Sequence, residues 1–173
     1  MAYKYFNDGM SMSCVEEGYT PSPGEAVFEE IATDAELAAN FPNYASARGA
    51  DKKVHLRLYA GFVHAQMLQA GILFNVATSG SALEVLCDGT DATAARLGSL
   101  WRFGATSPTA TRDWVDNNGH STTLTGAQFM TLDAKVGEWV SNTYAKLGEI
   151  NDAITAGSVT TNAQIDAEMW PAA

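Results

Sequence analysis

The stretch from Thr125 to Gly157 constrains the fold most, because it reads as a single helix long enough to organise a small domain. Its apolar side chains recur at steps of three, four and seven residues, which places them on one helical face. Thr125 and Gln128 have the spacing of a capping box, and Gly157 can adopt the left-handed conformation that ends helices. The apolar series is Phe129, Val136, Val140, Leu147, Ile150 and Ile154, with Thr143 in the same stripe.

Composition limits the class of partner. The chain has 173 residues, and its 20 acidic and 10 basic side chains give a net charge of -10. That charge argues against nucleic-acid binding and against attraction to anionic lipid. We find no apolar run long enough to cross a membrane, and the segment Met1–Asp8 lacks the apolar region of a secretory signal. We therefore expect a protein made and first used in a cytoplasm, without nucleic-acid or membrane partners.

Residues 1–50 are expected to form an N-terminal hairpin and arm with little core of its own. Two extended segments flank Asn7-Asp8-Gly9, a tight-turn sequence, and alternation predicts that Met10, Met12 and Cys14 share a buried face. A weak helix is predicted from Asp34 to Asn40, capped by Thr33 and ended before Pro42. Tyr44–Gly49 is interpreted as a linker.

Residues 51–173 are expected to form a compact α+β body, which begins with a second long helix that ends near Gly71. One apolar stripe contains Val54, Leu58, Gly61, Ala65 and Leu68, and another contains Leu56, Tyr59, Val63 and Ala70. Two stripes predict that this helix is covered on more than one side. The second cover is either another subunit or the rest of the same chain.

The remaining elements complete an α+β fold of small antiparallel hairpins, two long amphipathic helices and one short helix. Hairpins are predicted at Ile72–Cys87 and at Thr111–Leu124, the latter around Asn117-Asn118-Gly119. Between them, a short helix from Ala92 to Phe103 would end at Gly104. Its buried face is predicted to contain Ala95, Leu97, Leu100, Trp101 and Phe103. A last turn of helix at Thr160–Pro171 would fold Ile165 and Trp170 onto the core.

Residue chemistry does not predict catalysis, a cofactor or a metal. His55 and His64 are nine residues apart, so on a helix they are poorly placed to share a metal ion, and His120 lacks a spaced triad partner. The pairs Glu16-Glu17 and Glu29-Glu30 could suggest an acid/base pair, but solvated charges are the better interpretation. Asp113 and Asp116 flank Trp114, which could bind sugar or could simply be a core residue.

The two cysteines, Cys14 and Cys87, belong to no Cys-x-x-Cys pair. The simplest interpretation is two small, half-buried apolar side chains in strands. A bridge between them, or between subunits, remains the alternative if the protein reaches oxidising surroundings.

An ordered series of motifs over residues 52–171 resembles a domain-of-unknown-function family of tailed bacteriophages and prophages. The series is a glycine-led strand (Gly71–Val76), a Thr90-Asp91 turn into a helix, the Trp114 hairpin, the long Val-rich helix and a closing Ile-Asp…Trp-Pro (Ile165, Asp166, Trp170, Pro171). Members of that family are often encoded among tail-fibre genes or fused to fibre proteins. The resemblance implies a tail, fibre, collar or baseplate component, and it transfers no catalytic residues.

We therefore expect a structural virion protein, assembled in the host cytoplasm, that contacts other tail proteins through residues 1–50. A fibre-assembly chaperone and an envelope-degrading tail enzyme are the alternatives. Homo-oligomers are expected, with a trimer favoured because phage fibres are usually three-fold. The long C-terminal helix could form the seam, although the same stripe also suits packing within the chain, in which case the first long helix could serve instead.

Overall fold

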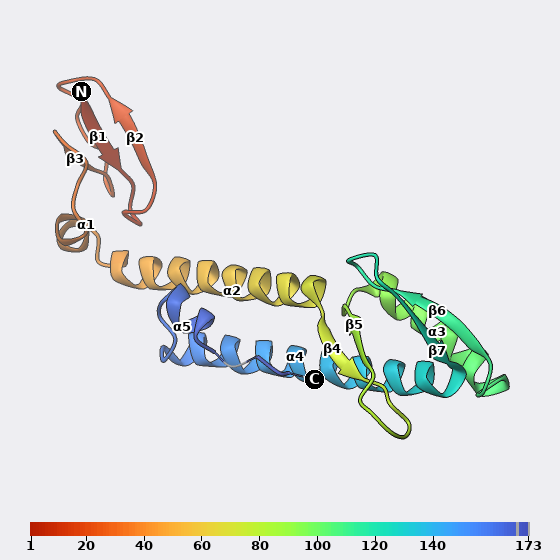
Figure 1. Cartoon of the computed structure of the whole chain (residues 1–173). Coiled ribbons are helices and arrows are strands. Elements are labelled where there is room, and N and C mark those ends of the chain that lie inside the picture. The colour runs from red at the N-terminus through yellow and green to blue at the C-terminus, as the bar shows by residue number, and fades with distance from the viewer. Residues whose placement is uncertain (169, 173) are drawn as a thin grey trace. The chain divides into compact units, whose positions relative to one another are not determined.

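The computed structural model describes residues 1–168 and 170–172, and it confirms an α+β fold (Figure 1). Contacts divide the chain into two compact units, Met1–Leu56 and Arg57–Ala173, and each is described by itself. In chain order the elements are β1 (Ala2–Tyr5), β2 (Met12–Val15), β3 (Ala26–Phe28), α1 (Asp34–Asn40), α2 (Tyr44–Ala70), β4 (Ile72–Asn75), β5 (Glu84–Cys87), α3 (Asp91–Thr106), β6 (Thr111–Val115), β7 (Ser121–Thr125), α4 (Gly126–Ala156) and α5 (Asn162–Asp166).

The first unit contains the predicted N-terminal hairpin within a three-stranded antiparallel sheet of order β2-β1-β3. The hairpin turn uses Gly9 at a φ of 69°, a conformation that favours glycine. Helix α1 begins and ends as predicted, with Thr33 and Glu36 forming a complete capping box. The sequence did not predict β3, because its three residues are fixed by pairing with β1 across a long separation in sequence.

The first unit has a small buried cluster of its own. Buried side chains come from the sheet, from α1 and from the start of α2: Tyr5, Leu37, Phe41 and Tyr44. The predicted linker at Tyr44–Gly49 is wrong, because this segment is the first part of α2. Burial of Tyr44, whose hydroxyl donates a 2.6 Å hydrogen bond to Asp34, stabilises helix at a segment whose Gly49 suggested a break.

Of the predicted buried face, Met12 and Cys14 are exposed, whereas Met10 lies partly buried against the core of the first unit. Met12 and Cys14 lie directly opposite Tyr5 and Tyr3 of β1, so all four side chains point to the same side of the sheet. The buried cluster covers β1 and β3 but does not extend over edge strand β2, and Met12 is 46% exposed. Alternation therefore predicted correctly which side chains share a face, but the buried cluster does not extend over that face at β2.

In the second unit, the long C-terminal helix is confirmed as α4. Thr125 and Gln128 form both hydrogen bonds of the capping box, and Gly157 ends the helix in the left-handed conformation at φ 83°. The predicted stripe faces the interior of the same chain, which favours intramolecular packing over a seam between subunits. The sequence missed two further residues of this face, Leu132 and Trp139.

Within the second unit, the part of α2 from Arg57 to Ala70 lies along α4 in the opposite direction (Figure 1). Arg57 donates a 2.8 Å hydrogen bond to Thr155, and His64 Nε2 is 3.2 Å from Thr143 Oγ1. Residue numbers in α4 therefore decrease as those in α2 increase, as expected for antiparallel helices. Tyr59 adds a 2.8 Å hydrogen bond to Asp166 of α5. Ala60, fully buried between these contacts, marks the face of α2 that packs within the chain.

Helix α3 extends past the predicted stop, so Gly104 lies inside the helix. Its role is close packing, because a Cβ at Gly104 would overlap the carbonyl oxygen of Gly126 at the start of α4. Leu97 is buried as predicted, and Leu100 and Phe103 pack on the core. The predictions for Ala95 and Trp101 are wrong, since Ala95 is exposed and Trp101 is 43% exposed.

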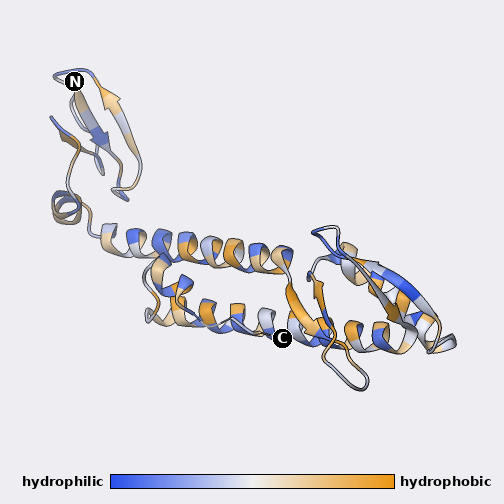
Figure 2. Cartoon of the chain, in the orientation of Figure 1, coloured by the Kyte–Doolittle hydropathy of each residue, from blue (hydrophilic) through white to orange (hydrophobic). Residues whose placement is uncertain are grey.

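The two predicted hairpins are confirmed as β4–β5 and β6–β7, and both contribute to the core of the second unit. Hydrophobic colour is nearly continuous along β4 and β5 in Figure 2. Members of the buried cluster are Phe74, Val76, Val85, Cys87, Leu97, Trp114, Leu124, Phe129, Leu132, Val136 and Trp139. The predicted last turn of helix is α5, with Ile165 fully buried.

Candidate functional site

The outer surface of α2 carries two large exposed apolar side chains one turn apart. Leu58 is 70% exposed and Phe62 is 55% exposed. Gly61 and Ala65 lie on the same helical face, between and beside the two large side chains. We call these residues, Leu58, Gly61, Phe62 and Ala65, the α2 patch. Contiguous exposed apolar side chains of this kind mark interaction surfaces more often than isolated ones do.

The α2 patch bears on the two predicted covers of this helix. The second unit covers the stripe that contains Leu58 only in part, since Leu58 is exposed whereas Leu68 packs against the core. The other stripe is partly buried at Tyr59 and Val63, and the buried residues Ala60 and His64 join it. Phe62 was missed, although its position one turn after Leu58 was a signal in the sequence.

His64 is a buried link between α2 and α4. Thr143 Oγ1 donates to the Val140 carbonyl oxygen at 2.8 Å, so it accepts from His64 Nε2, which assigns the proton to that nitrogen. The Tyr144 ring packs edge-on against the imidazole, with 4.5 Å between the ring centres, and the ring centre of Trp170 lies 5.9 Å from that of His64. Burial lowers the pKa of His64, because the surroundings disfavour a charged imidazole. The residue is therefore a neutral packing group at neutral pH.

In the first unit, the exposed side chains of β2 form a second candidate contact surface, which we call the β2 face. It consists of Met12 and Cys14, and a hollow of about 360 Å³ beside Cys14 is also lined by Glu16 and Glu17. As an edge strand, β2 also has one row of backbone groups without a partner strand. Apolar side chains next to an open strand edge suit the addition of a protein segment.

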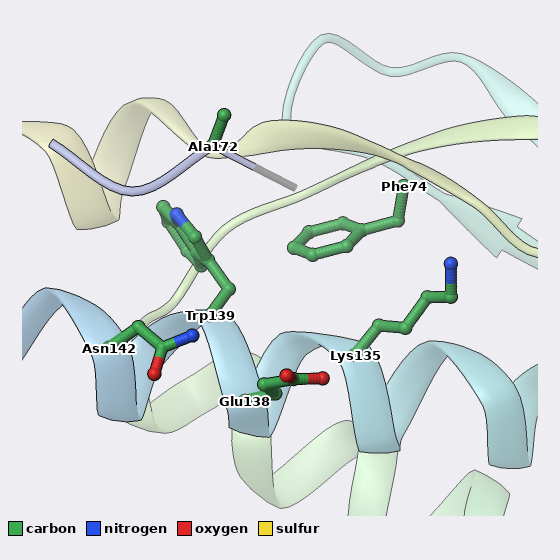
Figure 3. Close-up of a pocket in the computed structure, with 6 residues that line it drawn as sticks. All are labelled: Phe74, Lys135, Glu138, Trp139, Asn142 and Ala172. Atoms are coloured by element: carbon green, nitrogen blue, oxygen red, sulfur yellow. The ribbon is translucent and has the colours of Figure 1, made fainter. Parts of the chain in front are cut away.

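A hollow beside the core of the second unit is too small for a typical ligand. Figure 3 shows Phe74 and Trp139 in its interior, with Lys135, Glu138 and Asn142 of α4 around it. The two rings meet edge to face at 5.9 Å, and Trp139 Nε1 donates to the carbonyl oxygen of Pro171 at 3.0 Å. The volume of the hollow is about 170 Å³, below the roughly 300 Å³ of the smallest typical small-molecule pockets.

The histidines and glutamates considered from the sequence do not converge. His55 and His120 are exposed and contact Asp51 and Asp116 at 3.4 and 3.5 Å, whereas His64 is buried. The pairs Glu16-Glu17 and Glu29-Glu30 are exposed. Among residues 1–168 and 170–172, we find no group of three or more His, Cys, Asp or Glu side chains that could hold a metal ion.

Trp114 is a core residue, as the simpler interpretation predicted. Only 2% of the residue is exposed, its Nε1 donates to the Leu86 carbonyl oxygen at 3.1 Å, and the Arg96 guanidinium lies 4.0 Å from its ring centre. Asp113 accepts a 2.6 Å hydrogen bond from Thr123. The ring face that a sugar would need is therefore occupied by the protein itself.

Both cysteines are free thiols, and their environments differ. Cys14 is exposed on β2, which corrects its expected half-burial, whereas Cys87 is buried in the core. Burial and the nearby Asp88 carboxylate raise the pKa of the Cys87 thiol to about 12. Only Cys14 is thus accessible to thiol reagents.

The geometry defines an α+β protein whose candidate sites are exposed apolar surfaces. The family described as a domain of unknown function (DUF4376) matches residues 51–169, and the chain belongs to this family. The matched range nearly coincides with residues 52–171, which carry the motif series of the sequence resemblance. No curated protein and no solved structure matches the chain. Within the described part of the chain, no helix has the length and apolarity needed to span a membrane.

Proposed function

We propose that this protein is a structural component of a tailed-bacteriophage virion, associated with the tail fibre, collar or baseplate and acting through protein–protein contacts. The motif series that resembles phage and prophage proteins supports the setting. The β2 face supports the mode of action, and it is the observation that carries the proposal. Met12 and Cys14 are apolar, exposed and placed at an open strand edge, where an extended segment of another tail protein can add.

This assignment gives each unit a distinct role. The first unit docks on the larger particle through β2, and the second unit, which contains the family domain, forms the compact body. Self-association belongs to the same proposal, since tail components act in symmetric assemblies. No catalytic step, cofactor or nucleic-acid partner enters it.

Labelling of Cys14 tests this proposal directly. A maleimide should modify Cys14 in the isolated protein and leave buried Cys87 unmodified, giving one label per chain. In particles purified from induced cells that carry the gene, the chain should be present and Cys14 should be protected. Met12→Glu should reduce incorporation at least tenfold, while Trp101→Glu, at an exposed apolar side chain of the second unit, should not.

Three outcomes would contradict the proposal in different ways. Absence from purified particles, together with a requirement for the gene in fibre assembly, would favour a departing chaperone. Clearing of host envelope in a zymogram would favour a tail enzyme. A chain that is present with Cys14 fully reactive would remove the β2 face as the docking surface.

A further inference from the structure

We propose that the α2 patch binds a second copy of this chain, with the two α2 helices antiparallel about a two-fold axis that passes between Gly61 and Phe62. This inference concerns the isolated protein and does not depend on the virion assignment. It starts from the exposure of Leu58 and Phe62, whose side chains the second unit leaves in water. Burial of these side chains against another helix is favourable by the hydrophobic effect.

Shape identifies the second copy as the occupant. A two-fold interface needs one patch that carries both its protrusions and the hollows that receive them. The α2 patch meets this requirement, because Leu58 and Phe62 protrude while Gly61 and Ala65 are small. Beyond its chain neighbours and the adjacent backbone of its own helix, no atom lies within 4 Å of the position of a Cβ at Gly61, so the space above it is open.

The spacing of large and small residues selects the antiparallel direction. With the axis between residues 61 and 62, Leu58 faces Ala65 of the partner subunit and Phe62 faces Gly61 of the partner subunit. Each large side chain therefore meets a small one, which is the arrangement that lets helices approach closely. A parallel pair would instead place Gly61 on Gly61 of the partner subunit and leave a gap at that level.

Charge selects the same direction. Before Leu58, α2 contains Arg48, Lys52, Lys53 and Arg57 against a single Asp51, whereas residues 58–70 contain no Asp, Glu, Lys or Arg. A parallel pair would align the cationic halves of both helices, and their repulsion would oppose assembly. With the axis between residues 61 and 62, an antiparallel pair places Lys53 and Arg57 beside Ala70 and Gln66 of the partner subunit, in its uncharged half, and opposes the two helix dipoles favourably.

Contact over one face of a helix is smaller than the 1,200–2,000 Å² of a typical stable interface. The dimer should therefore be concentration-dependent. This two-copy arrangement differs from the trimer that the sequence favoured, and the two are separable by mass. Sedimentation velocity of the full chain over a concentration series should show a monomer–dimer equilibrium.

Gly61→Leu is the sharpest variant, because it places a large side chain in the hollow and its Cβ meets no other part of the protomer within 4 Å beyond the adjacent helix backbone. We expect it to weaken dimerisation at least tenfold while circular dichroism shows no loss of helix. Gly148→Leu is the matched control, since Gly148 also lies on a helix with no atom within 4 Å of a Cβ, and it should leave the equilibrium unchanged. Phe62→Glu should abolish the dimer. A monomer at every concentration, a trimer, or tighter assembly of Gly61→Leu would overturn the inference.

Cross-linking tests the direction in a Cys14→Ser background, with diamide as the added oxidant. An antiparallel pair predicts a disulfide only when Leu58→Cys protein is mixed with Ala65→Cys protein. Covalent dimers of either variant alone, in the absence of mixed dimers, would show a parallel pair and overturn the proposed geometry.

Discussion

At the scale of single residues, His64 shows that burial determines the protonation state of a side chain, which spacing in the sequence cannot predict. The sequence placed it on α2 and away from a metal site, but only the fold reveals that it is buried against Thr143, Tyr144 and Trp170. These neighbours are an alcohol and aromatic rings without negative charge, so burial disfavours the protonated imidazole. The imidazole is therefore a stabilising group in its neutral form alone.

Stability should fall as His64 becomes protonated. Folding lowers its pKa from the ordinary value of 6.5, so the unfolded chain binds more protons in the pH range between the two values. The contribution is complete above pH 6.5 and is lost as the pH falls below it. Urea unfolding at pH 7.5, 6.5 and 5.5 measures the effect. His64→Gln keeps a donor for Thr143 without a titrating group, and an equal fall in both proteins would contradict the prediction.

Glycines in α3 and α4 should respond oppositely to alanine. A Cβ at Gly104 would meet the backbone of Gly126, so Gly104→Ala forces two helices apart, and we expect a loss of about 1–3 kcal/mol in the free energy of unfolding. Gly148 has open space, and Gly148→Ala should stabilise the protein by up to about 1 kcal/mol through helix propensity. Urea denaturation of both variants should give opposite signs. If both variants changed the free energy of unfolding in the same direction, the backbone around Gly104 would accommodate the added methyl group without loss of stability.

At the scale of elements, local signals in the sequence located most boundaries correctly. Capping residues at Thr33 and Thr125, a glycine at position 157 and the Asn-Gly turn all act within a few residues of their own position. The start of α2 could not be predicted in this way, since it depends on burial of Tyr44 against the sheet. Strand β3 and the exposure of Met12 likewise depend on which strands the core covers.

The cap of α4 should contribute measurably to stability. Thr125→Ala removes the acceptor for Gln128 N–H and leaves one half of the capping box, so we expect a loss of about 0.5–2 kcal/mol. The urea midpoint should fall with an unchanged denaturant slope. Thr125→Ser keeps the hydroxyl and should restore most of the loss. No recovery with serine would show that the lost methyl group, rather than the cap, matters.

The candidate surfaces were only partly accessible to sequence reasoning. Periodicity identified the stripe that contains Leu58, but it could not say which of two apolar stripes the rest of the chain covers. Exposure depends on contacts between α2 and α4 that are 79 and 98 residues apart in sequence. The β2 face was unpredictable for the same reason. Alternation shows which side chains share one side of a sheet, but it does not show whether another element packs on that side.

At the scale of the whole molecule, each of the two units has a separate buried cluster. The first is built around Tyr5 and Phe41, and the second around Phe74, Trp114 and Trp139. The two clusters share no residue. Since the family domain begins at residue 51, six residues before the second unit, we expect residues 51–173 to fold without the preceding segment.

Tryptophan fluorescence reports this independence without interference. All four tryptophans, at positions 101, 114, 139 and 170, belong to the second unit, so thermal unfolding followed by their emission describes that unit alone. Deletion of residues 1–50 should retain a cooperative transition and shift the Tm by less than about 4 °C, the change that roughly 1 kcal/mol causes in a domain of this size. Both proteins must be compared at one concentration, because self-association would itself raise the Tm.

Leu132→Ala in the full chain provides the contrasting control. Leu132 is fully buried in the second cluster, so its truncation should cost about 2–5 kcal/mol and lower the Tm well beyond 4 °C. If the deletion lowered the Tm as far as this variant does, the second unit would depend on the first for its stability. The boundary within α2 would then separate two groups of contacts that do not fold independently. The docking and body roles could not be assigned to separate parts of the chain.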